Sequence, residues 1–199
     1  LDMNAPTPAW RTIAPMAFPR TYHVFTMLPD GNVLVTGGGR TTGQADLANA
    51  VYQAELWSTT SETWTTLSSM AAPRLYHGAA LLLPDARVLV TGGGRGYGVV
   101  APSDQLSAEM FAPPYLFKGA RPTITSAPAQ LSYGQAFSVQ TPQAATIASV
   151  SLISLGSMTH AFNMNQRYLS LAFVAGSGSL SVFYLAQQIY AAANSILNK

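Results

Sequence analysis

The sequence predicts an all-β protein in two parts, a pair of repeated four-strand units followed by a small β-sandwich. One observation behind this prediction is an internal repeat in the first half of the chain, with a period of about 54 residues. The other is a series of short strand-like runs, separated by turn residues, in the second half. We place the repeats at residues 1–118 and the sandwich at residues 119–199.

The repeat is defined by residues that recur at a fixed separation. A first set, Trp10, Met16, Pro19, Arg20, Tyr22 and His23, recurs as Trp64, Met70, Pro73, Arg74, Tyr76 and His77. The run Leu-Pro-Asp at 28–30 recurs at 83–85, and Val-Leu-Val-Thr-Gly-Gly-Gly at 33–39 recurs at 88–94, both at a separation longer by one. A one-residue insertion is therefore expected between His77 and Leu83.

Each repeat is expected to contain four strands, at residues 22–28, 33–36, 53–58 and 63–67 in the first copy. A turn sequence, Pro-Asp-Gly-Asn, separates the first two strands. Three glycines end the second strand, and no nucleotide-binding glycine spacing is present, so we expect them to serve backbone packing. Four strands with a glycine signature at this period are typical of a β-propeller blade, and the chain holds about two.

The second half alternates short strand-like runs with turns, which favours a sandwich. The expected strands are residues 123–125, 137–139, 149–155, 168–174 and 180–183. The tail at 183–199 differs, because Val182, Leu185, Ile189, Ala192 and Ile196 follow the 3,4 spacing of a helix. A sandwich should end on a strand, so helix and strand both stay open for this tail.

Composition excludes several classes of function. Charged residues are 9% of the 199, and the ten Lys and Arg are scattered singly, so no nucleic-acid partner is expected. The absence of cysteine excludes disulfides, thiolate catalysis and cysteine-ligated metals. The sequence has no run of about 18 apolar residues, so no membrane span is expected, and no signal peptide is visible at the N-terminus.

Three histidines, His23, His77 and His160, are the candidates for chemistry. Two of them follow a tyrosine, and at the start of a strand both side chains of such a pair can turn toward one ligand. A Tyr-His pair joined by a distant histidine would suit a cupric ion, whereas the alternative is a packing signature of the blade. Arg20 and Arg74 can likewise hold a backbone carbonyl or an anionic substrate.

Five segments carry a resemblance to a known family: PRLYHG at 73–78, LLPDARVLV at 82–90, AEMFAPPYL at 108–116, RPTI at 121–124 and SMTHAFNMNQR at 157–167. Together they resemble the last Kelch-type blades and the C-terminal immunoglobulin-like (early set) domain of the galactose oxidase and glyoxal oxidase family. The resemblance runs from about Trp10 to Leu180.

The resemblance implies a mononuclear copper centre that oxidises primary alcohols or aldehydes and reduces O2 to H2O2. It implies Tyr76 as axial ligand and proton acceptor, with His77 and His160 as the imidazole ligands, and Tyr22-His23 as a blade repeat. It also implies secretion. The family's tyrosine–cysteine cofactor cannot form within a chain that has no cysteine. We therefore expect a C-terminal fragment or truncated relative, incomplete for catalysis, whose open blade edges favour self-association.

Two other functions stay open from the sequence. A non-catalytic carbohydrate- or protein-binding module would use aromatic platforms such as Tyr97, Tyr115 and Tyr168. A hydrolase on a remodelled scaffold would use His77 or His160 as its base, although no further motif indicates one.

Overall fold

The computed structural model describes residues 1–94 and 102–183, and these residues form strands and short 3-10 turns without an α-helix. The chain divides into two compact units. The repeat unit contains residues 13–119 and 153–168, and the terminal unit contains residues 1–12, 120–152 and the chain from 169 onward. In the described part of the chain, no helix is long and apolar enough to cross a membrane.

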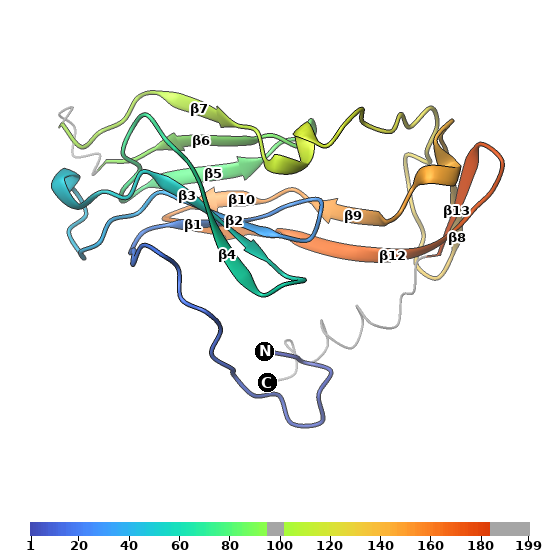
Figure 1. Cartoon of the computed structure of the whole chain (residues 1–199), viewed down its shortest axis with the longest axis horizontal. Helices are drawn as coiled ribbons and strands as arrows, with labels where there is room; N and C mark the ends of the chain where they lie inside the picture. The colour runs from blue at the N-terminus through green and yellow to red at the C-terminus, as the bar shows by residue number, and fades with distance from the viewer. Residues whose placement is uncertain (95–101, 184–199) are drawn as a thin grey trace. The chain divides into compact units, whose positions relative to one another are not determined.

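The first repeat is a four-stranded antiparallel sheet, as expected (Figure 1). Its strands are β1 (Val24–Met27), β2 (Val33–Thr36), β3 (Gln53–Ser58) and β4 (Thr63–Ser69), and they follow one another in this order across the sheet. Within the part of the chain that the structure describes, strand β1 is therefore an edge strand, with β2 on one side only.

The second repeat forms three described strands and not the four that we expected. They are β5 (Gly78–Leu82), β6 (Val88–Gly92) and β7 (Ala108–Phe111), in that order, with β5 at an edge. Soon after β7 the sequence has two prolines, and the second of them opens the 3-10 turn Pro114–Phe117. Proline has no N–H for a strand ladder, so the pattern of the first repeat ends here.

One apolar core joins the two sheets of the repeat unit. Its buried members come from both repeats and are Val24, Leu28, Leu34, Ala54, Met70, Ala80, Leu82, Val88 and Val90. The alternating burial of β5 and β6 shows that every second side chain faces this core, which is the pattern of a sheet with one covered face.

The terminal unit contains one sheet in its described residues, with strand order β8-β13-β12-β9. The strands are β8 (Ala136–Gln140), β9 (Val150–Ser154), β12 (Arg167–Ala175) and β13 (Ser179–Phe183), close to four of the expected runs. The fifth run, 123–125, forms no strand; its neighbour Ser126 makes an isolated bridge with Gln140.

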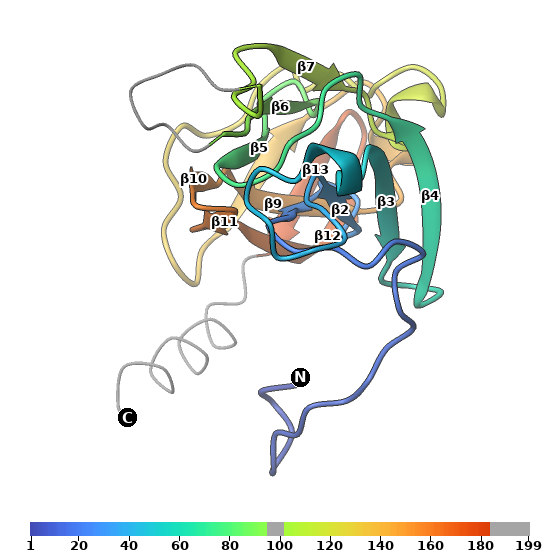
Figure 2. The same ribbon diagram turned by 90° about the vertical axis from the view of Figure 1, so that its left-hand side faces the viewer.

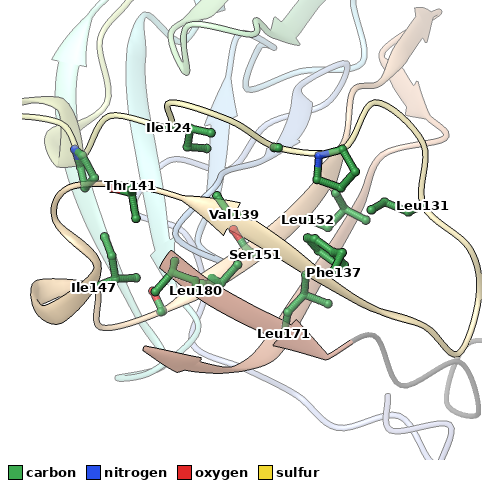
Figure 3. A pocket seen from close by; sticks show the side chains of 15 residues that line it. Ile124, Leu131, Phe137, Val139, Thr141, Ile147, Ser151, Leu152, Leu171 and Leu180 are labelled. Carbon is green, nitrogen blue, oxygen red and sulfur yellow. The ribbon is translucent and has the colours of Figure 1, made fainter. Parts of the chain in front are cut away.

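A largely apolar cavity of about 380 Å³ lies in the terminal unit (Figure 3). Leu171, Leu180 and Phe137 line it from the sheet, while Ile124 and Leu131 line it from the segment that precedes β8. The tail at 184–199, for which helix and strand were both left open, lies outside the described residues.

Candidate metal centre

The Tyr76-His77 segment is held by the backbone of the glycine run that follows β6. The N–H groups of Gly94 and Gly93 donate to the carbonyl oxygens of Tyr76 (2.7 Å) and His77 (3.2 Å). His77 itself has a left-handed backbone (φ 61°), an uncommon conformation for a residue with a Cβ. These bonds support the expectation that the glycines serve backbone packing.

Arg74, at the start of this segment, bonds to residues of both repeats. Its carbonyl accepts a hydrogen bond from Gly38 of the first repeat (2.7 Å). Its guanidinium donates to the carbonyls of Gly92 (3.1 Å) and Ser107 (2.8 Å) and pairs with Glu109 (2.9 Å) in the second repeat. The arginine therefore has the structural role of holding backbone carbonyls, one of the two roles considered from the sequence.

His160 stands at the tip of a short hairpin in the repeat unit. Strands β10 (Ser157–Thr159) and β11 (Phe162–Met164) pair with each other, so His160 and Ala161 form a two-residue turn. Both turn residues are left-handed (φ 50° and 65°), which is the pattern of a type I′ turn. Such turns favour Asn-Gly, so His-Ala is a strained choice, and strained residues cluster at functional sites.

The structure brings together the three side chains that the sequence singled out. The ring centroids lie 4.0 Å apart for Tyr76 and His77, 4.8 Å for His77 and His160, and 6.0 Å for Tyr76 and His160. Tyr76 is half-buried, and both histidines are exposed to solvent. Residues from distant parts of the sequence thus form one accessible cluster.

The chemistry of this cluster fits a cupric ion. A phenol oxygen and two imidazoles are the donors of a tetragonal N,O site. The Nδ1 atom of His160 lies 2.6 Å from Thr159 Oγ1, so Nε2 is the ring nitrogen that is available to a metal. Residues 1–94 and 102–183 contain no group of three or more His, Asp or Glu that could hold a metal, so a metal at this cluster would depend on the Tyr76 phenol as third donor.

Tyr22 is a neighbour of the cluster that the sequence did not predict. Its ring centroid lies 5.4 Å from that of Tyr76, in an edge-on contact, and its hydroxyl donates to the carbonyl of Thr42 (3.0 Å). The interpretation of Tyr22-His23 as a blade repeat gave no reason to expect this contact, because the sequence does not show which residues two blades bring together.

His23 has a different environment from His77. Its Nδ1 bonds to the Arg20 carbonyl (3.0 Å), and its ring lies edge-on to Phe25 at 4.7 Å. Burial lowers the pKa of His23 below its ordinary value; the bond to the Arg20 carbonyl opposes this shift, and the positive charge of Arg20 adds to it. His23 therefore has a structural role and contacts residues close to it in the sequence.

The one-residue insertion lies earlier than the sequence indicated. Val24 pairs with Thr36 in the first repeat, and Ala79 pairs with Thr91 in the second. Equivalent backbone positions are therefore already separated by the longer repeat distance where the first strand of each repeat begins. The extra residue is Leu75, which lies between Arg74 and the tyrosine and is 1% exposed. The two Tyr-His pairs therefore match in sequence but not in backbone position.

Other residues considered from the sequence have structural contacts. Asp30 and Asp85 accept the backbone N–H two residues ahead, which is the expected turn role. The hydroxyl of Tyr115 donates to the Ala86 carbonyl (2.6 Å). Tyr168 lies against Gly31. Tyr97 lies outside the described residues.

Comparisons with known proteins place these observations in a family. The glyoxal oxidase N-terminus family matches residues 1–115, and the galactose oxidase-like early set domain matches residues 121–194. Galactose oxidase from Gibberella zeae is 31% identical over 168 residues, which are 81% of this chain and 24% of that protein. Aldehyde oxidase GLOX from Vitis pseudoreticulata is 32% identical over 189 residues, which are 84% of this chain and 35% of that protein.

The fold has a solved counterpart. The structure of a fungal alcohol oxidase of the AA5 family, in complex with copper, has a TM-score of 0.79 to this chain and 24% sequence identity. The match covers 88% of this chain and 38% of the other. The all-β prediction and the family resemblance are thus both confirmed: the chain belongs to the galactose oxidase and glyoxal oxidase family, and it spans 24% and 35% of the two curated relatives named above.

Proposed function

We propose that this chain is the C-terminal, metal-binding part of a copper radical oxidase, and that Tyr76, His77 and His160 hold its copper ion. The observation that supports this most directly is the convergence of one phenol and two imidazoles, with ring centroids 4.0–6.0 Å apart, from two distant segments. These are also the positions that match the family's motifs.

Copper, when bound, supplies the redox chemistry that couples oxidation of a primary alcohol or aldehyde to reduction of O2 to H2O2. The chain's own residues would bind and orient it. His77 and His160 would supply imidazole nitrogens, and the hydrogen bond between the Thr159 hydroxyl and His160 Nδ1 would orient the ring of His160. The phenol oxygen of Tyr76 would accept the proton of the substrate hydroxyl.

The 199 residues contain no cysteine, so they cannot form the family's tyrosine–cysteine cofactor. They supply three protein ligands, and we expect this chain to bind copper without oxidising galactose or methylglyoxal. The named activities of the relatives, galactose oxidase and aldehyde oxidase, support small alcohols or aldehydes as the substrate class of the whole protein.

The test is copper stoichiometry by native mass spectrometry, together with peroxide release. We expect one copper per chain, and its loss in His160→Ala and in His77→Ala. His23→Ala is the matched control, because it removes the repeat-related imidazole outside the cluster and should leave copper uptake unchanged. Unchanged affinity in His160→Ala would contradict the proposal, and peroxide from the wild-type chain would contradict its catalytic incompleteness.

Secretion stays a prediction from the resemblance. Self-association through open blade edges also stays a prediction, and it applies best to edges whose backbone groups have no other partner. A strictly monomeric mass by light scattering at high protein concentration would contradict it.

A further inference from the structure

The side chain of Gln166 occupies the free edge of the first repeat. Its Oε1 accepts the N–H of Met27 (2.8 Å), and its Nε2 donates to the carbonyl of Phe25 (3.1 Å). Both backbone groups belong to β1, which has β2 on one side only. In a pair of parallel strands, each bonded residue makes the same two backbone hydrogen bonds. It accepts from one, and donates to the other, of the two residues that flank the residue opposite it. The carboxamide therefore replaces a missing strand.

A second carboxamide makes the related contact with the second repeat. Asn163 Nδ2 donates to the carbonyl of Ala80 (3.2 Å) in β5, the edge strand of its sheet. Its Oδ1 is buried and has no hydrogen-bond partner in the described part of the chain. Strand β10 lies beside β5 (Figure 2), and β11 contacts both β1 and β5. The histidine-bearing hairpin thus has one amide anchor on each repeat.

The hairpin needs such anchors, because it has little stability of its own. Strands β10 and β11 have three residues each, and among the described strands each pairs only with the other. A two-stranded hairpin is marginal in water. Its tip also holds two left-handed residues, His160 and Ala161, which add strain. Burial of Met158 and Ala161 against the core contributes contact area, but apolar contacts are not directional.

We propose that Gln166 and Asn163 are positioning residues that fix His160 relative to Tyr76 and His77 by bonding to the free edges of β1 and β5. The catalytic meaning of this inference rests on the proposed copper site. Gln166 makes two bonds and Asn163 makes one, so Gln166 is the main anchor. The anchors act on the position of the imidazole and not on the metal directly.

The test compares the wild-type chain with Gln166→Met, which keeps the side-chain length and removes both bonds. Gln140→Met is the matched control, because the Gln140 side chain is exposed and its amide bonds to nearby Ser138. Two measurements need no metal: hydrogen exchange of the Met27 amide, and the NMR shift of the His160 ring, which the rings of His77 and Tyr76 influence. The third is the electron paramagnetic resonance spectrum of the copper-loaded chain.

In Gln166→Met we expect about tenfold faster exchange at Met27, a moved His160 resonance and a copper spectrum that differs from that of the wild-type chain. Gln140→Met should change none of these. Gln166→Glu is a second variant in case Gln166→Met fails to fold. Its carboxylate still accepts from Met27 but cannot donate to Phe25, so Met27 should stay protected while His160 moves.

The failures of the two proposals are distinguishable. If the wild-type chain takes up no copper, the proposed function fails, while the Met27 and His160 measurements still decide whether Gln166 is an anchor. Wild-type exchange at Met27 together with an unmoved His160 resonance in Gln166→Met would overturn the anchor, whatever the copper result.

Discussion

The two repeats have the same buried arginine–glutamate pair in different surroundings. Arg20 and Glu55 of the first repeat are both fully buried, whereas in the second repeat Arg74 is 1% exposed and Glu109 27% exposed. Arg20 Nε also reaches the carbonyl of Phe18, while Arg74 Nε is buried without a partner among the described residues. The arginine of the first repeat is therefore the better satisfied of the two, and the second repeat carries two of the three candidate ligands.

The residues after each arginine explain the different fates of the two histidines. Leu75 is an added residue, so Tyr76 occupies the backbone position of Thr21, and His77 that of Tyr22. Tyr22 and His77 indeed share the left-handed conformation (φ 57° and 61°). One inserted residue thus moves the histidine out of the place where His23 bonds to its own arginine's carbonyl. A repeated motif can thus become part of a candidate site through a change of register.

The largest expected effect separates the two arginines. Arg20→Met leaves the Glu55 carboxylate fully buried without its cation, and we expect a loss of about 3–5 kcal/mol in the free energy of unfolding. Arg74→Met should cost less, because Glu109 is partly exposed and still accepts the N–H groups of Ala71 and Ala72. Urea unfolding of both variants measures the difference, and equal losses would contradict the role given to burial.

A second variant tests the turn that contains His77. The carbonyl of Leu75 accepts the N–H of Gly78, and a Cβ on Gly78 would lie 2.9 Å from that oxygen. We expect Gly78→Ala to cost about 1–3 kcal/mol and to weaken copper uptake. Gly176→Ala is the control, since its Cβ meets only ordinary contacts. Unfolding and metal titration would show whether His77 depends on this turn.

How much the sequence could predict differs between the local and the distant parts of the molecule. The strands of the first repeat were predicted nearly to the residue, because β-branched runs and turn residues mark them locally. Tyr76, His77 and His160 came from motifs. The motifs did not show the position of the insertion, because the Tyr-His motif recurs at the shorter separation while equivalent backbone positions recur at the longer one. They also did not indicate the contacts of Gln166, whose two partners lie at sequence separations of 139 and 141.

A smaller effect concerns the hairpin turns of the two repeats. Gly31 and Ala86 hold the same left-handed position (φ 81° and 68°), which favours glycine. Ala86→Gly should relieve strain but add freedom to the unfolded chain, for a net gain of up to about 1 kcal/mol. Gly31→Ala should lose a similar amount. Thermal unfolding of the pair checks this, and a destabilised Ala86→Gly would show that the alanine is not strained.

The smallest expected effect is a pH dependence specific to the first repeat. The folded-state pKa of His23 is lowered by burial, so the unfolded chain binds the proton more tightly. Its stabilising contribution is complete above the unfolded pKa of about 6.5 and is lost as pH falls through the folded pKa. His23→Gln should flatten the stability profile in this range. A slope between pH 7 and pH 5 that is unchanged in the variant would assign the dependence to other groups.

The long reach of Gln166 also sets the order in which the site can assemble. Strand β7 of the second repeat ends at Phe111, well before Gln166, and the contacts within each sheet join residues much closer in the chain. Contacts of long sequence separation form late, and ribosomes deliver the N-terminal residues first. At roughly 5–20 residues per second, the repeats exist for about 3–10 seconds before the hairpin is made. If copper binds as proposed, an ion that arrives in that interval would find Tyr76 and His77 without His160, so the timing of metal uptake relative to folding would matter.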